Sequence, residues 1–227
     1  CTPARYSLMT GQMAFRVPNG GTVFQGAGGP SLIAPGKLTL PRMLKKQGYA
    51  TAAVGKWHIG LTFRDQAGEA IHSGERAAVQ RIDYSRRIEG GPLDHGFDQF
   101  FGTVCCPTTD WLYAFIDGDR IPVPPTGHID KSNLPKHPYA NDCRPGFIAP
   151  DFPMEEGDLV FLKKSREFIQ QHTDKPFFLF HATQAVHLPS FAAPEFKGRT
   201  QVGPHGDFIA EFDPIVGELM RELETHG

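Results

Sequence analysis

Two short runs of apolar residues predict buried strands, and each follows a stretch with helical spacing. The first run, Tyr49 to Val54, follows a brief helical pattern over residues 41–48 and ends at Gly55-Lys56. The second run, Phe177 to Phe180, follows an amphipathic pattern over residues 159–169. Helices that alternate with short apolar strands are typical of an α/β fold with a mainly parallel or mixed sheet between helices. We therefore expect helices on both faces of one open sheet.

Further helices are predicted at the two ends of the chain. Residues 2–11 predict a short helix with Thr2 as its N-cap and Pro3 at its first position. Near the end, Asp213-Pro214 predicts the start of a helix that carries an apolar stripe, and Pro214 predicts a break from the residues before it.

The segments between these elements predict loops and one hairpin. Residues 17–36 contain six glycines and three prolines, which indicates a surface loop that borders a cleft. Residues 111–123 alternate in polarity and predict two strands joined at Asp117-Gly118. Residues 126–153 are rich in Pro, Asn, Asp and His and predict an irregular excursion.

Composition narrows the class of protein. The 227 residues are 40% hydrophobic and 21% charged, which is the balance of a globular protein. The formal net charge of −2 provides no basic field for a polyanion, so we expect no nucleic-acid partner. No run of eighteen apolar residues is present, so we expect no membrane span in this segment.

The four cysteines show no zinc-binding spacing. Cys105 and Cys106 are interpreted as small buried residues, with a bridge from one of them to Cys143 as the alternative. The chain starts at Cys1 rather than Met and ends directly after an apolar helical pattern. We therefore expect a chain truncated at both ends, with residues 1–227 as the central part of a single domain.

Candidate chemistry gathers where the two predicted strands end. Lys56 and His58 follow the first strand, and residues 181–187 with their two histidines follow the second. Ligands of open α/β sheets bind outside the carboxyl ends of the strands. These two strand ends therefore predict one shared crevice.

Cys1 and Arg5 lie one helical turn apart at a predicted helix N-terminus, where both can address an anion. A phosphatase loop needs five residues between its Cys and Arg, and this chain has three. A cysteine protease would need a paired His and gives no reason for the Pro-x-Arg that follows Cys1. The pattern favours a Cys that is itself a precursor.

Cys1-Thr2-Pro3-Ala4-Arg5 resembles the C-x-P-x-R motif of the type I sulfatases, in which a maturation enzyme oxidises the Cys to formylglycine. Gly48 to His58 resembles the second motif of that family. The resemblance extends over nearly the whole chain and includes Asp94 to Asp98, Ala185-Val186-His187 and Gly206-Asp207-Phe208.

The resemblance implies an arylsulfatase-like catalytic domain with an alkaline-phosphatase-like fold, acting on sulfated carbohydrates or aryl sulfates. It implies that formylglycine at position 1 attacks the sulfur of the ester while Arg5 holds this nucleophile. Lys56 and His187 would bind the sulfate, His187 would donate a proton, and His58 would be the base for the elimination step.

The resemblance also implies a calcium ion with position 1, as formylglycine, among its ligands. We expect the other ligands and a second sulfate-binding lysine outside this chain, so we expect the isolated 227-residue piece to be inactive. A periplasmic or secreted location follows from the same resemblance, as do a sulfate ester substrate and a formylglycine-generating enzyme as partners.

Two alternatives remain open. One is a phosphoester or phosphonate hydrolase of the same superfamily, and the other is a non-catalytic binder of sulfated glycans in which Cys1 stays a thiol. His95 and His181 are interpreted as structural residues. Asp110 and Trp111 either line a sugar subsite or, as we prefer, are a hairpin-start Asp and a core Trp.

Overall fold

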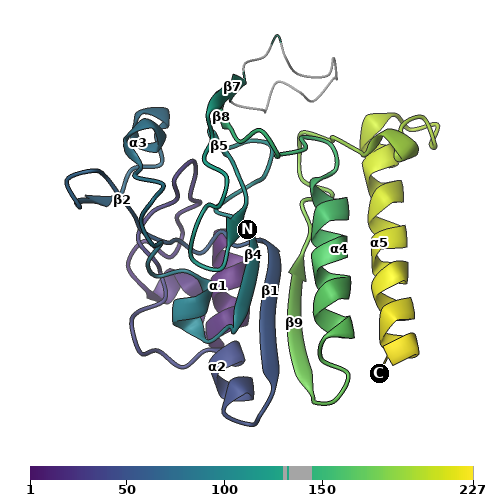
Figure 1. Cartoon of the computed structure of the whole chain (residues 1–227), viewed down its shortest axis with the longest axis horizontal. Helices are drawn as coiled ribbons and strands as arrows, with labels where there is room; N and C mark the ends of the chain where they lie inside the picture. Colours follow the sequence, from purple (N-terminus) through teal and green to yellow (C-terminus); the bar gives the residue numbers. More distant parts are fainter. Residues whose placement is uncertain (130–131, 133–144, 227) are drawn as a thin grey trace.

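A mixed sheet of four strands, in the order β6-β4-β1-β9, lies at the centre of the computed structural model, which describes residues 1–129, 132 and 145–226 (Figure 1). Strand β1 (Ala50–Lys56) pairs in parallel with β4 (Gln99–Thr103) and with β9 (Phe177–Ala182). Strand β6 (Ile116–Asp117) is antiparallel to β4. The predicted α/β class, the mixed sheet and the two predicted strands are confirmed.

Helices cover both faces of this sheet, as the alternating pattern predicted. Helix α2 (Leu40–Lys45) and helix α4 (Gly157–Gln170) both contact β1, and Figure 1 shows them on opposite sides of it. Helix α1 (Thr2–Thr10) packs beside α2, and α5 (Pro204–His226) packs on the outer side of α4. All seven residues of β1 are buried between these layers.

Two glycines bring the three parallel strands together at their carboxyl ends. Gly55 is paired with Gly102 on β4 and with Ala182 on β9. A Cβ atom at Gly55 would lie 2.0 Å from the carbonyl oxygen of Ala182, and one at Gly102 would lie 1.8 Å from the carbonyl oxygen of Gly55. Any side chain here would push the strands apart, so the close approach beside Lys56 requires glycine.

The predicted hairpin at Asp117-Gly118 is wrong. Strand β5 (Leu112–Tyr113) pairs in parallel with β8 (Gly146–Ile148), whereas β6 pairs with β4 of the central sheet. A local turn does form, because Asp117 and Arg120 make an isolated bridge, but the two strands belong to different sheets. Distant partners, which local alternation does not reveal, decided the pairing.

The segment 126–153, predicted to be irregular, contains two strands in its described part. Strand β7 (Gly127–Ile129) is antiparallel to β8, and with β5 they form a three-stranded sheet. Cys143 lies outside the described residues, so the bridge considered for it stays untested. Cys105 and Cys106 are both buried, as predicted.

Two helix boundaries differ from the prediction. Cys1, not Thr2, is the N-cap of α1, although Cys1 does lie at the helix N-terminus as expected. Helix α5 continues through Pro214, so the predicted break is wrong and Asp213 is not an N-cap. Phe208 and Ile215, on either side of Pro214, are both buried, and this packing holds the helix together despite the missing N–H.

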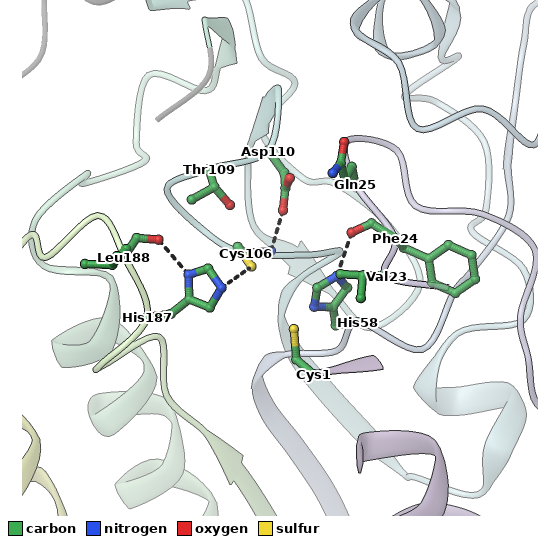
Figure 2. Close-up of a pocket in the computed structure, with 10 residues that line it drawn as sticks. All are labelled: Cys1, Val23, Phe24, Gln25, His58, Cys106, Thr109, Asp110, His187 and Leu188. Carbon is green, nitrogen blue, oxygen red and sulfur yellow. Dashed lines mark hydrogen bonds between the residues drawn. The ribbon is translucent and has the colours of Figure 1, made fainter. Parts of the chain in front are cut away.

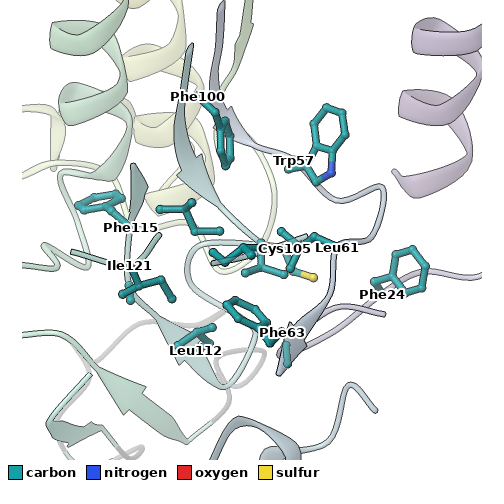
Figure 3. Packing of buried hydrophobic residues seen from close by; sticks show 14 of the residues in the cluster. Phe24, Trp57, Leu61, Phe63, Phe100, Cys105, Leu112, Phe115 and Ile121 are labelled. Atoms are coloured by element: carbon teal, nitrogen blue, oxygen red, sulfur yellow. The ribbon is translucent and has the colours of Figure 1, made fainter. Parts of the chain in front are cut away.

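The large apolar cluster lies between the central sheet and the loops at its carboxyl end (Figure 3). Within it, the ring centroid of Phe115 lies 5.0 Å from that of Phe101 and 4.7 Å from that of Phe152. Trp57, directly after β1, is 1% exposed and packs against Phe97. This packing fixes the backbone on both sides of the strand end that carries Lys56 and His58.

The remaining elements are short and peripheral. They are β2 (Phe63–Arg64), β3 (Ala70–Ile71), α3 (Arg76–Arg81) and the 3₁₀ helices Ala14–Arg16, Pro92–His95 and Pro194–Phe196. Among the described residues, no helix combines the length and the apolarity needed to cross a bilayer.

Candidate active site

A cavity of about 340 Å³ opens where β1 and β9 end, as the two strand ends predicted (Figure 2). Cys1 reaches it from the start of α1, His58 from the residues after β1, and His187 from the residues after β9. The loops after α1 and after β4 complete the wall. The residues that line the cavity are Cys1, Val23, Phe24, Gln25, His58, Cys106, Thr109, Asp110, His187 and Leu188.

Lys56 contacts the sulfur atoms of Cys1 and Cys106, two residues that line this cavity. Its side chain is buried at 3% exposure, and its ammonium nitrogen lies 3.4 Å from Cys1 Sγ and 2.7 Å from Cys106 Sγ. A buried ammonium group is costly unless an anion or strong acceptors surround it. The site is therefore built to hold negative charge next to position 1.

Arg5 joins the start of α1 to the end of β1. Its guanidinium donates to the backbone oxygen of Lys56 at 2.5 Å and lies 5.7 Å from the ring centroid of Phe180. Burial lowers the pKa of Arg5 to about 10, so the side chain is still charged at neutral pH. Arg5 thus adds a second positive charge one helical turn from Cys1. Its hydrogen bond to Lys56 also holds the N-terminus of α1 against the carboxyl end of β1.

His58 is a neutral imidazole with one ring nitrogen available. Its Nε2 donates to the carbonyl oxygen of Phe24 at 2.6 Å, which leaves Nδ1 as the unprotonated nitrogen. Nδ1 is buried without a partner among the described residues, and Figure 2 shows it on the side of Cys1. Burial, together with the charge of Lys56, lowers the pKa of His58 to about 3. A neutral ring with a free lone pair is the form that accepts a proton.

His187 faces the cavity from the opposite wall. Its Nδ1 donates to the carbonyl oxygen of Leu188 at 2.6 Å, and its Nε2 lies 3.7 Å from Cys106 Sγ. The hydrogen bond to Cys106 raises the pKa of His187. A ring that carries protons on both nitrogens is a hydrogen-bond donor toward an anion in the cavity.

The structure brings together all five residues predicted from the sequence. Cys1, His58 and His187 line the cavity, Lys56 contacts Cys1, and Arg5 contacts the backbone of Lys56. The parallel strands explain this arrangement, because they end at the same edge of the sheet.

The sequence reasoning gave Cys106 no part in the site and named Asp110 only in its less favoured alternative. Cys106, interpreted only as a buried residue, contacts both Lys56 and His187. Asp110 is not the start of a hairpin, since it lines the cavity and accepts a hydrogen bond from the Cys106 backbone N–H at 2.9 Å. Both residues follow β4, a third parallel strand that ends at the same edge of the sheet. Recognition of that strand in the sequence would have identified them as candidates.

The remaining candidates lie away from the cavity. His95 is 3% exposed, stacks on Trp57 and lies 2.8 Å from Ser31 Oγ, as a structural role predicts. His181 lies on β9 with its Nδ1 2.7 Å from Ser165 Oγ. Trp111 packs only partly buried against the core and lines a neighbouring cavity of about 830 Å³.

The described residues do not offer a calcium site. Calcium is bound by six to eight oxygen ligands, chiefly carboxylates and carbonyls. Within residues 1–129, 132 and 145–226, no three His, Cys, Asp or Glu side chains come together in a way that suits a metal ion.

This α/β fold carries two cationic side chains at the carboxyl ends of its parallel strands, an arrangement that suits an anionic ligand. The family model for sulfatases matches residues 1–227, so the chain belongs to the sulfatase family. The predicted family is confirmed.

The curated relatives are sulfatases of glycans and of aryl substrates. The chain is 30% identical to N-acetylgalactosamine-6-sulfatase of Sus scrofa, a match that covers 100% of this chain and 39% of that protein. It is 28% identical to N-acetylgalactosamine-6-O-sulfatase of Bacteroides thetaiotaomicron and 27% identical to arylsulfatase A of Bos taurus. Those matches cover 99% and 100% of this chain, and 46% and 40% of the relatives. The chain thus spans less than half the length of these proteins.

Solved structures support the same fold. A Bacteroides thetaiotaomicron structure from work on glycosaminoglycan metabolism has a TM-score of 0.76 at 24% identity, covering 99% of this chain and 49% of that one. A sulfatase from Pseudoalteromonas sp. has a TM-score of 0.64 at 25% identity, covering 100% of this chain and 42% of its own. The predicted alkaline-phosphatase-like sulfatase fold is confirmed.

Proposed function

We propose that residues 1–227 are the central part of the catalytic domain of a sulfuric ester hydrolase whose nucleophile is formylglycine made from Cys1. The observation that carries this proposal is the position of Lys56, whose buried ammonium group lies 3.4 Å from the Sγ atom of Cys1, a residue that lines the cavity. An ester sulfate held there presents its sulfur atom to position 1.

The hydrated aldehyde supplies two hydroxyl groups, one to attack the sulfur and one to release the sulfate afterwards. Lys56 binds a sulfate oxygen and stabilises the negative charge. Arg5 holds the start of α1 against the end of β1 and keeps position 1 in place. A sulfate ester carries one negative charge, which these two cations offset.

The two histidines of the cavity, His58 and His187, transfer the protons. Nδ1 of His58 is the unprotonated ring nitrogen on the side of Cys1 (Figure 2), and it accepts the proton of the second hydroxyl in the elimination step. On the opposite wall, the hydrogen bond to Cys106 raises the pKa of His187 and so favours its protonated form, which donates to a sulfate oxygen or to the leaving alcohol oxygen. Proton acceptor and donor thus lie on opposite sides of position 1.

We infer a sulfated carbohydrate as the substrate class. The neighbouring cavity shares Val23, Phe24 and Gln25 with the active site and adds Trp111 together with polar side chains. An aromatic ring beside polar groups suits a sugar ring, which has apolar faces and hydroxyl edges. The names of the N-acetylgalactosamine-6-sulfatases are consistent with this class. A periplasmic or secreted location is part of the same proposal.

The test uses the protein expressed in full length together with a formylglycine-generating enzyme. Mass spectrometry of the peptide that begins at Cys1 should show the thiol replaced by an aldehyde. The same material should release sulfate from a model aryl sulfate and from 6-sulfated N-acetylgalactosamine, and Cys1→Ala should abolish this release. Undiminished turnover by Cys1→Ala would refute the proposal.

A phosphate ester of the same alcohol provides the control for the reaction class. We expect the sulfate ester to be cleaved faster, because Lys56 and Arg5 match a singly charged ester. Faster cleavage of the phosphate ester would favour a phosphoester hydrolase. Binding of the sulfated sugar with no turnover and with Cys1 unmodified would favour a glycan-binding protein.

A further inference from the structure

Cys106 is a second sulfur in the active-site cavity. Its Sγ lies 2.7 Å from the ammonium nitrogen of Lys56 and 3.7 Å from Nε2 of His187. Cys106 enters from the loop after β4, whereas Cys1 enters from α1, and both sulfurs contact the same ammonium group. The mechanism above uses Cys1 and assigns nothing to Cys106.

The charges around Cys106 favour the thiolate. Burial raises the pKa of its thiol, but the hydrogen bond from His187 and the charge of Lys56 outweigh burial and lower the pKa overall. Asp110, whose carboxylate accepts from the Cys106 backbone N–H, acts in the opposite direction. A thiolate beside an ammonium group and an imidazolium is the arrangement found in reactive cysteines.

The small exposed part of Cys106 faces the cavity. The residue is 5% exposed, and it lines a cavity of about 340 Å³, which is large enough for a small molecule. His58, which lines the same cavity, is 1% exposed, and its Nδ1 has no hydrogen-bond partner among the described residues. A polar atom at the cavity is therefore available to a ligand. Cys105, the adjacent residue, instead packs into the apolar core beside Leu61 (Figure 3).

We propose that Cys106 is a covalent modification site, at which small uncharged electrophiles such as peroxides react with its sulfur and thereby close the anion site on Lys56. With hydrogen peroxide, the thiolate attacks one oxygen, an S–O bond forms and the O–O bond breaks. The attacked oxygen keeps its hydrogen and the other oxygen leaves as hydroxide, so the sulfur is oxidised to a sulfenic acid and the peroxide is reduced. The reaction needs no formylglycine, so it is independent of the proposed sulfatase activity.

The position of Cys106 explains why its modification would block the anion site. The added group lies between Lys56 and His187, where the sulfate ester is proposed to bind. Exposure to peroxide is thus expected to inactivate the enzyme even when position 1 is fully converted.

The experiment measures alkylation of the full-length protein by iodoacetamide at pH 6.5, followed by peptide mass spectrometry that separates the cysteines. In this probe reaction, a C–S bond forms, the C–I bond breaks and iodide leaves. We expect Cys106 to react roughly tenfold or more faster than Cys105, because the thiolate is the reactive form. Equal rates for these neighbours, or labelling of Cys106 only after denaturation, would overturn the proposal.

Two further measurements test whether Lys56 stabilises the Cys106 thiolate and whether peroxide oxidises Cys106. The midpoint of the pH–rate profile for Cys106 should lie below that of a free cysteine, about 8.5. Lys56→Met should move this midpoint to higher pH, with circular dichroism used to confirm that the variant folds. If that variant does not fold, the profile of the wild-type chain still decides, because a midpoint at or above the free value contradicts a stabilised thiolate. After peroxide treatment, a reagent specific for sulfenic acids should label Cys106 and leave Cys105 unlabelled.

Discussion

The ammonium nitrogen of Lys56 lies 3.4 Å from Cys1 Sγ, although 55 residues separate the two in the sequence. Lys56 is the last residue of β1, and Cys1 is the N-cap of α1. Arg5, one turn into α1, donates to the backbone of Lys56 and holds the two element ends together. The nucleophile position and its cation are thus fixed by the main elements of the fold rather than by flexible loops.

Lys56→Met should lower kcat/KM for sulfate ester cleavage by roughly 10- to 150-fold, because a charge-assisted hydrogen bond contributes about 1.5 to 3 kcal/mol. Methionine keeps most of the volume of the side chain and removes its charge. Sulfate release by the full-length, converted protein is the measurement. Lys175→Met, at an exposed lysine before β9, is the matched control and should leave kcat/KM unchanged. Equal rates for wild type and Lys56→Met would exclude Lys56 from sulfate binding.

Cys106→Ser should move the alkaline limb of the pH profile of kcat/KM to lower pH. The hydrogen bond to Cys106 raises the pKa of His187, and serine replaces the thiolate by a neutral hydroxyl group. His187 then loses its proton at lower pH, and the limb reports the ionisation of the free enzyme. Cys105→Ala, one residue away in the core, should not move the limb. An unchanged limb in Cys106→Ser would mean that another group controls it.

Asp158→Asn should destabilise the chain by about 1 to 3 kcal/mol and also lower sulfate release. Asp158, in the first turn of α4, accepts hydrogen bonds from the backbone N–H groups of Gln184 and Ala185, both at 2.7 Å. Asparagine offers only one oxygen, so one N–H loses its acceptor, and the backbone that leads to His187 shifts. Urea unfolding and kcat/KM measure the two effects.

The exposed Asp174→Asn provides the comparison for that variant. Loss of stability with unchanged kcat/KM in Asp158→Asn would show that the two hydrogen bonds do not position His187.

Glu211→Gln should remove a pH dependence of stability between about pH 4.5 and 7. Burial raises the folded-state pKa of Glu211 to about 7, above its unfolded value. The folded state therefore favours the protonated acid, and this contribution is fully present below pH 4.5 and is lost as the pH rises through 7. The loss is on the order of 1 to 3 kcal/mol.

The backbone N–H of Ala193 donates to the Glu211 carboxylate at 2.8 Å. Glutamine keeps an oxygen that can accept this hydrogen bond, but its side chain does not ionise. The difference in unfolding free energy between pH 5 and pH 8 should thus be smaller in Glu211→Gln than in wild type. Glu224→Gln, exposed on the same helix, should behave as wild type. If all three proteins show the same difference, Glu211 does not titrate in the expected range.

Local patterns predicted the elements on which the site is built. The apolar run that became β1, the run that became β9 and the helical spacing of Cys1 and Arg5 were all visible in the sequence. Each depends on interactions within a few residues, which periodicity and capping describe well. The convergence of Lys56 and His187 followed from the rule that parallel strands end at one edge.

Features that depend on distant partners were not predictable. The segment 111–123 looked like a hairpin, but β5 and β6 pair with β8 and β4, and local alternation does not distinguish these pairings. Pro214 signals a break in an isolated helix, whereas packing on α4 keeps α5 continuous. Cys106 has no recognisable motif, and only the end of a third strand brought it to Lys56.

The contact between Gly55 and Gly102 limits how enzymes with this sheet can diversify. No residue with a side chain fits at either position, so the edge of the sheet beside the cation is closed to gradual substitution. The loop that contributes Val23 to Gln25 and the one that contributes Thr109 and Asp110 have no such constraint on their length. New substrate preferences would therefore arise by exchange of these two loops around an unchanged strand end.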